Sequence, residues 1–458
     1  MATDRQAVIW TACGDTPRRM GALTVTDTQC RFTYDPAFLD SGLPGLSLLY
    51  PPGLIGSRTI PWERSAWFDL FPPLQSLVPP ASEANFQRRL VLAWLEKQGH
   101  KPAPGFDSDW AILMTAGHGG IGHLDVFADD ARATAWYANG SDRPLQAIEA
   151  SLGFSLKEFL TWFDHDAGGI LGALGPTPTV GGAIPKLLLA IPATGWDGRV
   201  GLPRRGRSTP DQTDVVLKFE RSHYPGMVEL EALALEMHKA AGFAVPRYWV
   251  TTINDIPAIA IERFDRTPEG RPLCAETLYS LMAIGDRRVD NHYSGRYDDI
   301  ARALESSPIP LVSDPAAAKR QLVQRLLLAM LTGNGDLHLE NLSLLQDGAQ
   351  TAFSPVYDPT PMRAYSLHNE LCAMPFGDYG EYDERERLVD YDTAMERFRK
   401  RLGYTPSQFR ELAEAMLSVT IEYAGRLEGL HTLPDPNRRN LIRIVERERT
   451  RMTRCLAP

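Results

Sequence analysis

Short apolar stretches separated by proline and glycine characterise the first part of the chain. Gly21–Asp27 alternates apolar and polar residues as a strand does, and Pro44, Gly45, Pro72 and Pro73 punctuate the pattern as turn residues. One helix is expected around Glu83–Gly99, where apolar side chains gather toward one face and Gly99 supplies a stop. The pattern predicts a strand-rich N-terminal subdomain over residues 1–145.

The middle of the chain predicts a small mixed sheet crossed by one helix. Strands are expected at Asp214–Phe219 and in the apolar segment Ile256–Asp265, with a helix at Met227–Gly242 between them. Ala167–Pro185 contains no charged residue, but its six Gly and three Pro exclude a stable membrane helix, so a loop is expected there. We assign residues 146–268 to this second domain.

From about Arg271 onward the hydrophobic pattern becomes helical. Arg320–Leu331 is apolar on several sides, which is typical of a helix buried in a larger domain. Another helix is expected to begin at Thr405, which can form a capping box with Gln408. The predicted fold is therefore α+β, with residues 269–458 forming an all-helical C-terminal domain.

Composition narrows the function classes. The 458 residues are 43% hydrophobic and 23% charged, which excludes wholesale disorder, and the net charge of −9 argues against non-specific coating of nucleic acid. Seven Arg and two Glu in Asn437–Cys455 are therefore interpreted as a solvated helix face. Five scattered cysteines, without a C-x-x-C pair, disfavour disulfides and favour a reducing cytoplasm, and Met1–Trp10 lacks a secretory pattern.

The chemically most informative segment is Gly333–Leu342, directly after the apolar helix. Asp336 and Asn341 stand five residues apart, the spacing by which a kinase catalytic loop places a carboxylate against the attacking hydroxyl and an amide oxygen against magnesium. Asp358 follows 22 residues after Asp336 and would supply a second oxygen ligand. Taken alone, the same spacing is also compatible with a simple turn.

Upstream residues favour the kinase interpretation. Lys218 lies in an apolar strand, where its charge needs a partner, and Glu231 follows thirteen residues later in the next helix, with Glu229 as a competing partner. The alternative is an edge-strand lysine whose ammonium group lies in water. The order of these elements is that of a nucleotide-binding kinase lobe.

A glycine-rich segment precedes that strand. Gly181 and Gly182 would let backbone N–H groups approach phosphate oxygens, and Lys186 would add positive charge. A flexible surface connection explains the same residues equally well.

A second glycine cluster, Gly117–Asp125, contains His118 and His123. The histidine spacing fits no common zinc pattern, so we expect tight-turn residues between two strands rather than metal ligands.

These motifs resemble the HipA family of bacterial serine/threonine kinases, the toxin half of type II toxin–antitoxin modules. The resemblance is carried mainly by Glu262–Arg266 and Gly333–Asn341, with weaker likeness at Tyr357–Asp358 and in the N-terminal segments Thr33–Pro36 and Leu46–Leu48. It implies a protein-kinase-like bilobal fold, a cytoplasmic location, and ATP and Mg²⁺ as cofactors.

The resemblance also implies roles for individual residues. Asp336 would be the catalytic base, Asn341 and Asp358 the magnesium ligands, and Lys218 the phosphate-orienting lysine. The nucleotide would further meet Gly181, Gly182, Lys186, Glu231 and His338, with Glu262 and Phe264 as the adenine-facing hinge. Family members autophosphorylate a hydroxyl residue in the glycine-rich loop, and the matching residue here is Thr179. Glu340 and Pro185 stand where the family often has a lysine and a polar residue.

The family's best-known target is a serine of an aminoacyl-tRNA synthetase, and its usual partner is a helix-turn-helix antitoxin that binds operator DNA. Two other functions remain open. Small-molecule kinases of the aminoglycoside or choline type have a similar phosphotransfer loop, although they have no comparable N-terminal module. A catalytically silent kinase-like protein that only holds a DNA-binding partner is the other alternative, which an intact set of catalytic residues disfavours.

Overall fold

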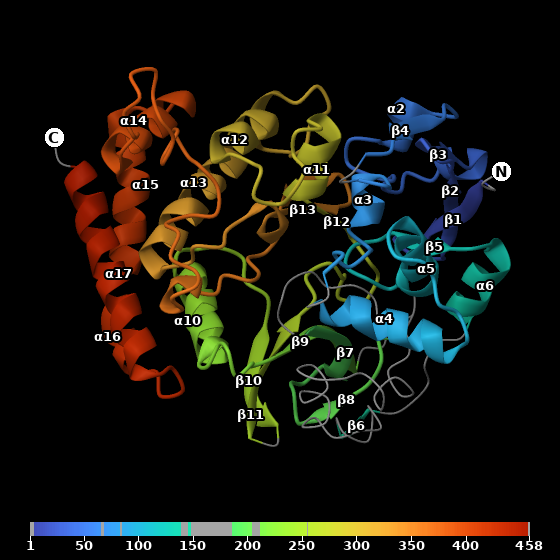
Figure 1. Cartoon of the computed structure of the whole chain (residues 1–458), viewed down its shortest axis with the longest axis horizontal. Coiled ribbons are helices and arrows are strands. Elements are labelled where there is room, and N and C mark those ends of the chain that lie inside the picture. Colours follow the sequence, from blue (N-terminus) through green and yellow to red (C-terminus); the bar gives the residue numbers. More distant parts are fainter. Residues whose placement is uncertain are drawn as a thin grey trace. The chain divides into compact units, whose positions relative to one another are not determined.

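The computed structural model describes residues 4–65, 68–82, 85–138, 145–147, 186–203, 211–253 and 255–456 (Figure 1). The chain divides into two compact units. Unit 1 comprises Met1–Phe219, Arg247–Glu276 and Leu345–Asp347. Unit 2 comprises Glu220–Pro246, Thr277–Leu344 and Gly348–Pro458.

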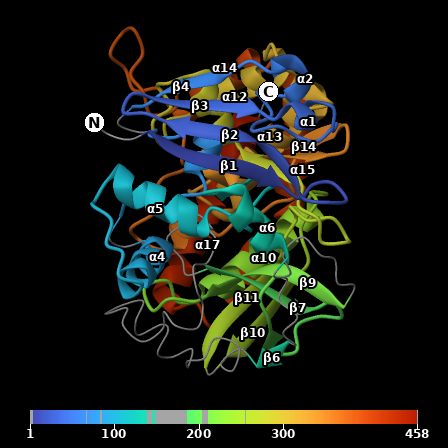
Figure 2. The same ribbon diagram turned by 90° about the vertical axis from the view of Figure 1, so that its right-hand side faces the viewer.

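Unit 1 contains a five-stranded antiparallel sheet in the order β4-β3-β2-β1-β5 (Figure 2). Its strands are β1 (Arg5–Thr11), β2 (Arg18–Val25), β3 (Gln29–Tyr34), β4 (Ile60–Glu63) and β5 (Asp125–Phe127). Every second side chain of β3 points to the buried face of the sheet: Cys30, Phe32 and Tyr34 are each at most 1% exposed. The strands expected in this region are present, but helices, of which only one was expected, hold more of its described residues than strands do.

In the described part of unit 1, this sheet is accompanied by the helices α1 (Pro36–Leu39), α2 (Pro52–Ile55), α3 (Pro72–Gln75), α4 (Phe86–Lys97), α5 (Phe106–Ala116) and α6 (Asp130–Ala138). The helix predicted at Glu83–Gly99 is confirmed as α4. The cluster Gly117–Asp125 follows helix α5, so the expectation that it joins two strands was wrong in that respect. Helix α5 was missed because Ala111–Ala116 is nearly uniformly apolar and shows no clear helical period.

A second antiparallel sheet of unit 1 has the order β10-β11-β9-β7. It consists of β7 (Lys186–Pro192), β9 (Gln212–Phe219), β10 (Tyr248–Ile253) and β11 (Ile256–Glu262), and the two-residue strands β6 (Gln146–Ala147) and β8 (Arg199–Val200) pair separately. Leu90 of α4 packs with buried leucine, valine and isoleucine side chains of β7 and β9. The predicted strand at Asp214–Phe219 is therefore an interior strand of a sheet with its own core.

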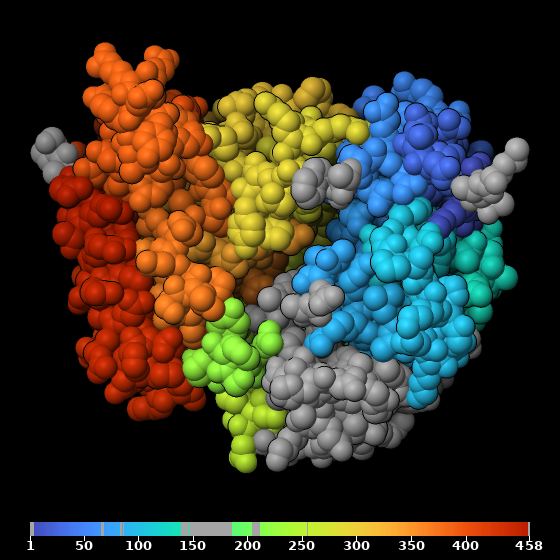
Figure 3. Space-filling model, viewed as in Figure 1, coloured from blue at the N-terminus to red at the C-terminus, as the bar shows by residue number. Residues whose placement is uncertain are grey.

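Unit 2 is built mainly from helices: α10 (Met227–Ala240), α11 (Leu278–Gly285), α12 (Tyr297–Ser306), α13 (Pro315–Thr332), α14 (Tyr391–Arg401), α15 (Pro406–Val419), α16 (Tyr423–Glu428) and α17 (Asp435–Cys455). Helix α13 contacts α12, α15 and α17, and the segment from α14 to α17 forms one continuous orange-to-red surface in Figure 3. The predicted capping box of Thr405 and Gln408 is present.

Strands also occur in the region expected to be all-helical. They are β12 (Cys274–Thr277), β13 (Ser343–Asp347) and β14 (Gln350–Phe353), accompanied by the 3₁₀ turns η1 (Leu339–Asn341) and η2 (Met362–Ala364). The expectation of an all-helical domain is corrected in this detail. The Asp347-Gly348 dipeptide is typical of a tight turn between two antiparallel strands and could have indicated β13 and β14 in the sequence. Gly348 adopts a φ of 57°.

The free cysteines agree with the sequence-based expectation, whereas Ala167–Pro185, where a loop was expected, lies outside the described residues. All five cysteines are free thiols. Among the described residues, no helix is both long and apolar enough to cross a membrane.

Candidate active site

The loop that carries Asp336 is fixed at its first residues. Gly333 ends the buried helix α13 with a φ of 80°, a conformation that strongly favours glycine. A Cβ on Gly335 would lie 2.5 Å from the backbone oxygen of Glu370, so only glycine fits there. The side-chain oxygen of Asn334 accepts a hydrogen bond from the backbone N–H of Asp336 at 2.9 Å. Close packing at Gly333 and Gly335 therefore determines the direction in which the loop that carries Asp336 leaves helix α13.

Asp336 and Asn341 are joined directly. The side-chain nitrogen of Asn341 donates to the backbone oxygen of Asp336 at 2.7 Å, and the backbone N–H of His338 donates to the same oxygen at 2.9 Å. With its nitrogen used inside the loop, the amide of Asn341 presents its oxygen as the remaining polar atom. Oxygen is the atom that magnesium requires, so Asn341 fits the predicted role of a metal ligand.

The Asp336 carboxylate meets two aromatic residues. The hydroxyl of Tyr293 donates to Oδ1 of Asp336 at 3.1 Å, and Nε2 of His338 lies 3.9 Å from Oδ2. The Asp336 side chain remains 34% exposed. A reacting hydroxyl group can therefore approach the Asp336 carboxylate from solvent. The hydrogen bond from Tyr293 meanwhile restricts the orientation of that carboxylate. Tyr293 was missed in the sequence, because nothing near it shows that residues 43 positions apart meet.

Two tyrosines, the buried Tyr297 and the partly buried Tyr357, support the loop. Tyr297 donates its hydroxyl to the backbone oxygen of Leu337 at 2.7 Å, and Tyr357 donates to that of Glu340 at 2.5 Å. Burial raises the pKa of both hydroxyl groups above the usual tyrosine range, so they stay protonated donors at neutral pH. The loop is thus held at two successive points by neutral hydrogen bonds.

Asp358 directly follows the supporting Tyr357. Its φ is 52°, a left-handed conformation that is uncommon for residues other than glycine but more accessible to Asp than to most. Tyr357 places the chain beside the loop that carries Asp336 and Asn341, which brings Asp358 to the same part of unit 2. Its role as a second magnesium ligand stays a prediction.

Lys218 and Lys186 face each other across adjacent strands. Strands β7 and β9 pair them directly, and the two residues are only 5% (Lys186) and 4% (Lys218) exposed. Because β9 lies between β11 and β7, the alternative of an edge-strand lysine with its ammonium in water is excluded. Lys186 begins a strand rather than lying in a loop. Paired cations of this kind suit the binding of phosphate.

The predicted partner of Lys218 belongs to unit 2. Glu231 is fully buried on α10, and its pairing with Lys218 stays a prediction. The competitor Glu229 instead accepts a hydrogen bond from the backbone N–H of Thr432 at 3.1 Å. That contact gives Glu229 a structural role within unit 2.

At the expected hinge, the side chain of Glu262 pairs with Arg247 through two contacts of 2.7 and 2.9 Å. Strand β11 ends at Glu262, and Phe264 is half-buried just after it. The adenine-facing role of both residues stays a prediction. Thr179, Gly181 and Gly182 lie outside the described residues.

The charged residues around Phe264 have a structural role that the sequence did not reveal. The side chains of Arg263 and Asp265 are 0% and 1% exposed and pair at 2.7 Å, and Arg266 also reaches Asp265 at 2.8 Å. Burial alone would raise the pKa of Asp265, but the two guanidinium groups outweigh it and lower the pKa to about 2. The backbone N–H of Gly122 donates to Asp265 at 2.7 Å, so this cluster anchors the second glycine-rich loop.

Of the two histidines of that loop, His123 is buried and His118 is partly buried. Nε2 of His123 lies 2.8 Å from the backbone oxygen of Gly45, and burial lowers its pKa to about 4. His118 stacks on Phe127 with ring centroids 4.8 Å apart. Both histidines thus have contacts within the protein, and the expectation that they are not metal ligands stays a prediction.

Comparison of the sequence with known proteins finds relatives of the kind that the sequence motifs indicated. The family model of the HipA-like C-terminal domain matches residues 179–422. A Haemophilus influenzae protein named "Putative kinase" is 27% identical over 236 residues, which span 49% of this chain and 62% of that protein. The "Serine/threonine-protein kinase toxin HipA" of Shewanella oneidensis is 27% identical over 180 residues, 37% of this chain and 41% of that protein. Both matches cover less than two thirds of the relative.

Among solved structures, the chain resembles HipA from the Shewanella oneidensis MR-1 complex of HipA, HipB and operator DNA. The TM-score is 0.63 at 18% identity, and the likeness covers 97% of both chains. The predicted mixed helix-and-sheet, kinase-like bilobal fold is thereby confirmed.

Proposed function

Because this chain belongs to the family defined by the HipA-like C-terminal domain, we propose that it is an ATP- and Mg²⁺-dependent serine/threonine protein kinase. One observation carries the proposal: a single short loop holds the Asp336 carboxylate accessible to solvent and bonds Asn341 so that its oxygen remains for a metal. Phosphoryl transfer is catalysed mainly by such positioning and by charge stabilisation.

In the proposed reaction, Asp336 accepts the proton of a substrate hydroxyl. The hydroxyl oxygen forms a bond to the γ-phosphorus of ATP, the bond from that phosphorus to the bridging oxygen breaks, and ADP leaves with the electron pair. The hydrogen bond from Tyr293 holds the carboxylate in the orientation that receives the proton. Lys218 and Lys186 balance phosphate charge. Magnesium held by Asn341 and Asp358 would supply further charge neutralisation when bound.

For the substrate we propose a cellular protein, with a serine of an aminoacyl-tRNA synthetase as the first candidate. Its modification would arrest growth, as expected of a toxin. A DNA-binding antitoxin is the proposed partner. The support for it is that the chain resembles HipA, which was solved in complex with HipB and operator DNA. Co-expression with the gene next to its own, followed by purification through a tag on this chain, tests the partnership.

We also propose that Thr179 is a site of autophosphorylation. A phosphate there would add about −1.5 to −2 charges beside the nucleotide's own phosphates and would weaken ATP binding. Phosphopeptide mapping after prolonged incubation with ATP tests this, with Thr179→Val as the variant and Thr177→Val as its control. Modification confined to other residues would remove Thr179 from the proposal.

The experiment that tests the kinase function is incubation of the full chain with Mg²⁺ and labelled ATP, with and without cell extract, followed by mass spectrometry. Label on a protein Ser or Thr, absent with Asp336→Asn, supports the proposal. Label found only on small molecules would instead identify a small-molecule kinase. No transfer under either condition would indicate a catalytically silent protein.

A further inference from the structure

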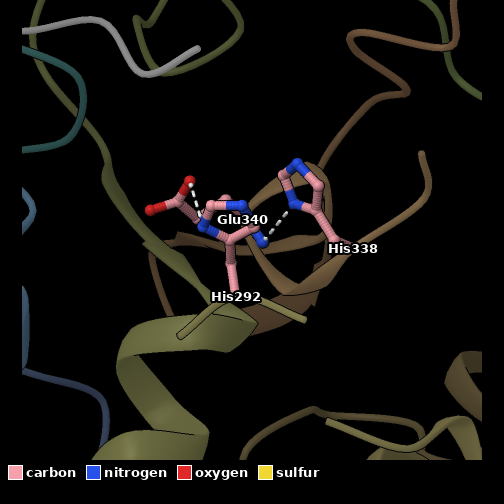
Figure 4. A group of neighbouring side chains, drawn as sticks. All are labelled: His292, His338 and Glu340. Atoms are coloured by element: carbon pink, nitrogen blue, oxygen red, sulfur yellow. Dashed lines mark hydrogen bonds and ion pairs between the residues drawn. The ribbon is translucent and has the colours of Figure 1, made fainter. Parts of the chain in front are cut away.

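Three potential metal ligands converge beside the catalytic loop. His292 lies between α11 and α12, while His338 and Glu340 lie in the loop itself (Figure 4). Each offers one ligand atom, and these atoms all lie within 4.8 Å of one another. Among the described residues, this is the group of His, Cys, Asp and Glu side chains that satisfies such a criterion. We call these three residues the His292 cluster.

The spacing of two of the atoms already matches a metal site. Nδ1 of His292 lies 3.4 Å from Oε2 of Glu340. Two ligands bound at about 2.0–2.1 Å to a tetrahedral ion are separated by roughly 3.4 Å. An ion placed between these atoms would therefore need almost no rearrangement of either side chain. The ring centroids of His292 and His338 lie 4.3 Å apart, and the ligand atom of His338 lies within 4.8 Å of the other two.

The chemistry of the ligands distinguishes this site from the predicted magnesium site. Two imidazoles and one carboxylate suit zinc and similar transition-metal ions, whereas magnesium prefers ligands that are all oxygen. The side chains of His292 and Glu340 are each 32% exposed, so an ion can enter from solvent and keep a water molecule as its fourth ligand. A closed structural site would bury all of its ligands.

Ligation through Nδ1 of His338 would change an existing contact. Nδ1 of His338 accepts a hydrogen bond from the backbone N–H of Glu340 at 3.2 Å, so the lone pair of that nitrogen is in use. Ligation through this nitrogen replaces a neutral hydrogen bond, whose net contribution to stability is small because water competes for both groups. The bond belongs to the turn η1 that ends at Asn341, so an ion here would alter the segment that carries the predicted magnesium ligand.

We propose that His292, His338 and Glu340 form a binding site for a zinc-type divalent ion, separate from the magnesium site of the kinase reaction. The proposal does not rest on phosphoryl transfer, because ligand identity and geometry alone carry it. The site would connect the availability of a transition metal to the conformation of the catalytic loop.

The test uses the full chain, first treated with a chelator and then titrated with Zn²⁺ in excess Mg²⁺ by calorimetry. Wild type is expected to bind one equivalent with high affinity. His292→Ala and Glu340→Gln should each weaken binding by about tenfold or more, as losing a ligand costs at least as much as losing one of its hydrogen-bonded neighbours. His431→Ala is the matched control, since it removes an exposed imidazole of unit 2. It should bind as wild type does.

A second measurement uses Co²⁺ as a spectroscopic probe of wild type and therefore does not depend on any variant folding. The intense visible absorption of a four-coordinate, nitrogen-ligated Co²⁺ ion supports the site. The weak spectrum of a six-coordinate, all-oxygen ion overturns it. Absence of Zn²⁺ binding, unchanged affinity in folded His292→Ala, or equal loss in His431→Ala would overturn it as well.

Discussion

The side-chain amide of Asn341 donates its hydrogen bond to the backbone oxygen of Asp336, five residues earlier, at 2.7 Å. The residue proposed to hold magnesium is therefore part of the frame that positions the proposed base. The five-residue spacing of Asp336 and Asn341 thus corresponds to a hydrogen bond that closes the loop. Because this bond uses the side-chain nitrogen of Asn341, the side-chain oxygen is the atom available for a metal.

Replacing the base should abolish catalysis without unfolding the protein. Asp336→Asn is expected to lower the rate of phosphoryl transfer by about 10²-fold or more, because a general base contributes at least that much. The melting temperature should stay close to wild type, since the side chain is partly exposed. Asp347→Asn, which changes an exposed carboxylate, is the control. Wild-type rates in Asp336→Asn would exclude Asp336 as the base.

Two substitutions at Asn341 separate its two roles. Asn341→Asp keeps an oxygen ligand but loses the N–H donor, whereas Asn341→Ala loses both. We expect Asn341→Ala to have the lower rate at limiting Mg²⁺ and to recover partly at high Mg²⁺, with stability lowered by only about 1 kcal/mol. Rates measured across a Mg²⁺ titration check this. A rate of Asn341→Ala that is independent of Mg²⁺ concentration would contradict the assignment.

Tyr293 is expected to act as a positioning residue. Tyr293→Phe removes the hydroxyl that contacts Asp336 but keeps the ring, so kcat should fall by about tenfold or more, in line with a hydrogen bond to a charged group. The KM for ATP should not change. Tyr382→Phe, at a tyrosine that is 74% exposed, serves as the comparison. An unchanged kcat in Tyr293→Phe would show that the contact has no part in catalysis.

Removing one partner of a buried ion pair should destabilise unit 2. The side chains of Arg363 and Glu448 are each 2% exposed and lie 3.3 Å apart. Glu448→Gln leaves a buried guanidinium without its carboxylate and should lower the free energy of unfolding by about 3 kcal/mol. Glu446→Gln, at an exposed position of the same helix, should change it little. Equal chemical-denaturation midpoints for the two variants would refute this expectation.

Acid should destabilise unit 2 through His238. Burial lowers the pKa of His238 to about 4, below the value near 6.5 of an unfolded histidine. Its contribution is therefore complete above pH 6.5, decreases between pH 6.5 and 4, and is lost below pH 4, amounting to about 3 kcal/mol. Urea unfolding at pH 7 and pH 4.5 measures it. His238→Gln should reduce the pH dependence, whereas His431→Gln, at an exposed site, should retain it.

The sequence alone predicted the features that depend on local pattern. Periodicity located the buried helix that ends at Thr332, and capping chemistry located the helix that begins at Thr405. The spacing of Asp336 and Asn341 indicated a catalytic loop, since five residues of chain suffice to bring them together. These features are local because the interacting groups are close along the chain.

The tertiary structure decided which distant residues meet. It placed Lys186 opposite Lys218, brought Tyr293 to Asp336, and brought His292 to Glu340. It also showed that Arg263 and Asp265 anchor a loop far away in sequence. No local pattern encodes these contacts, because strand register and loop packing are set by the burial of side chains from many segments at once.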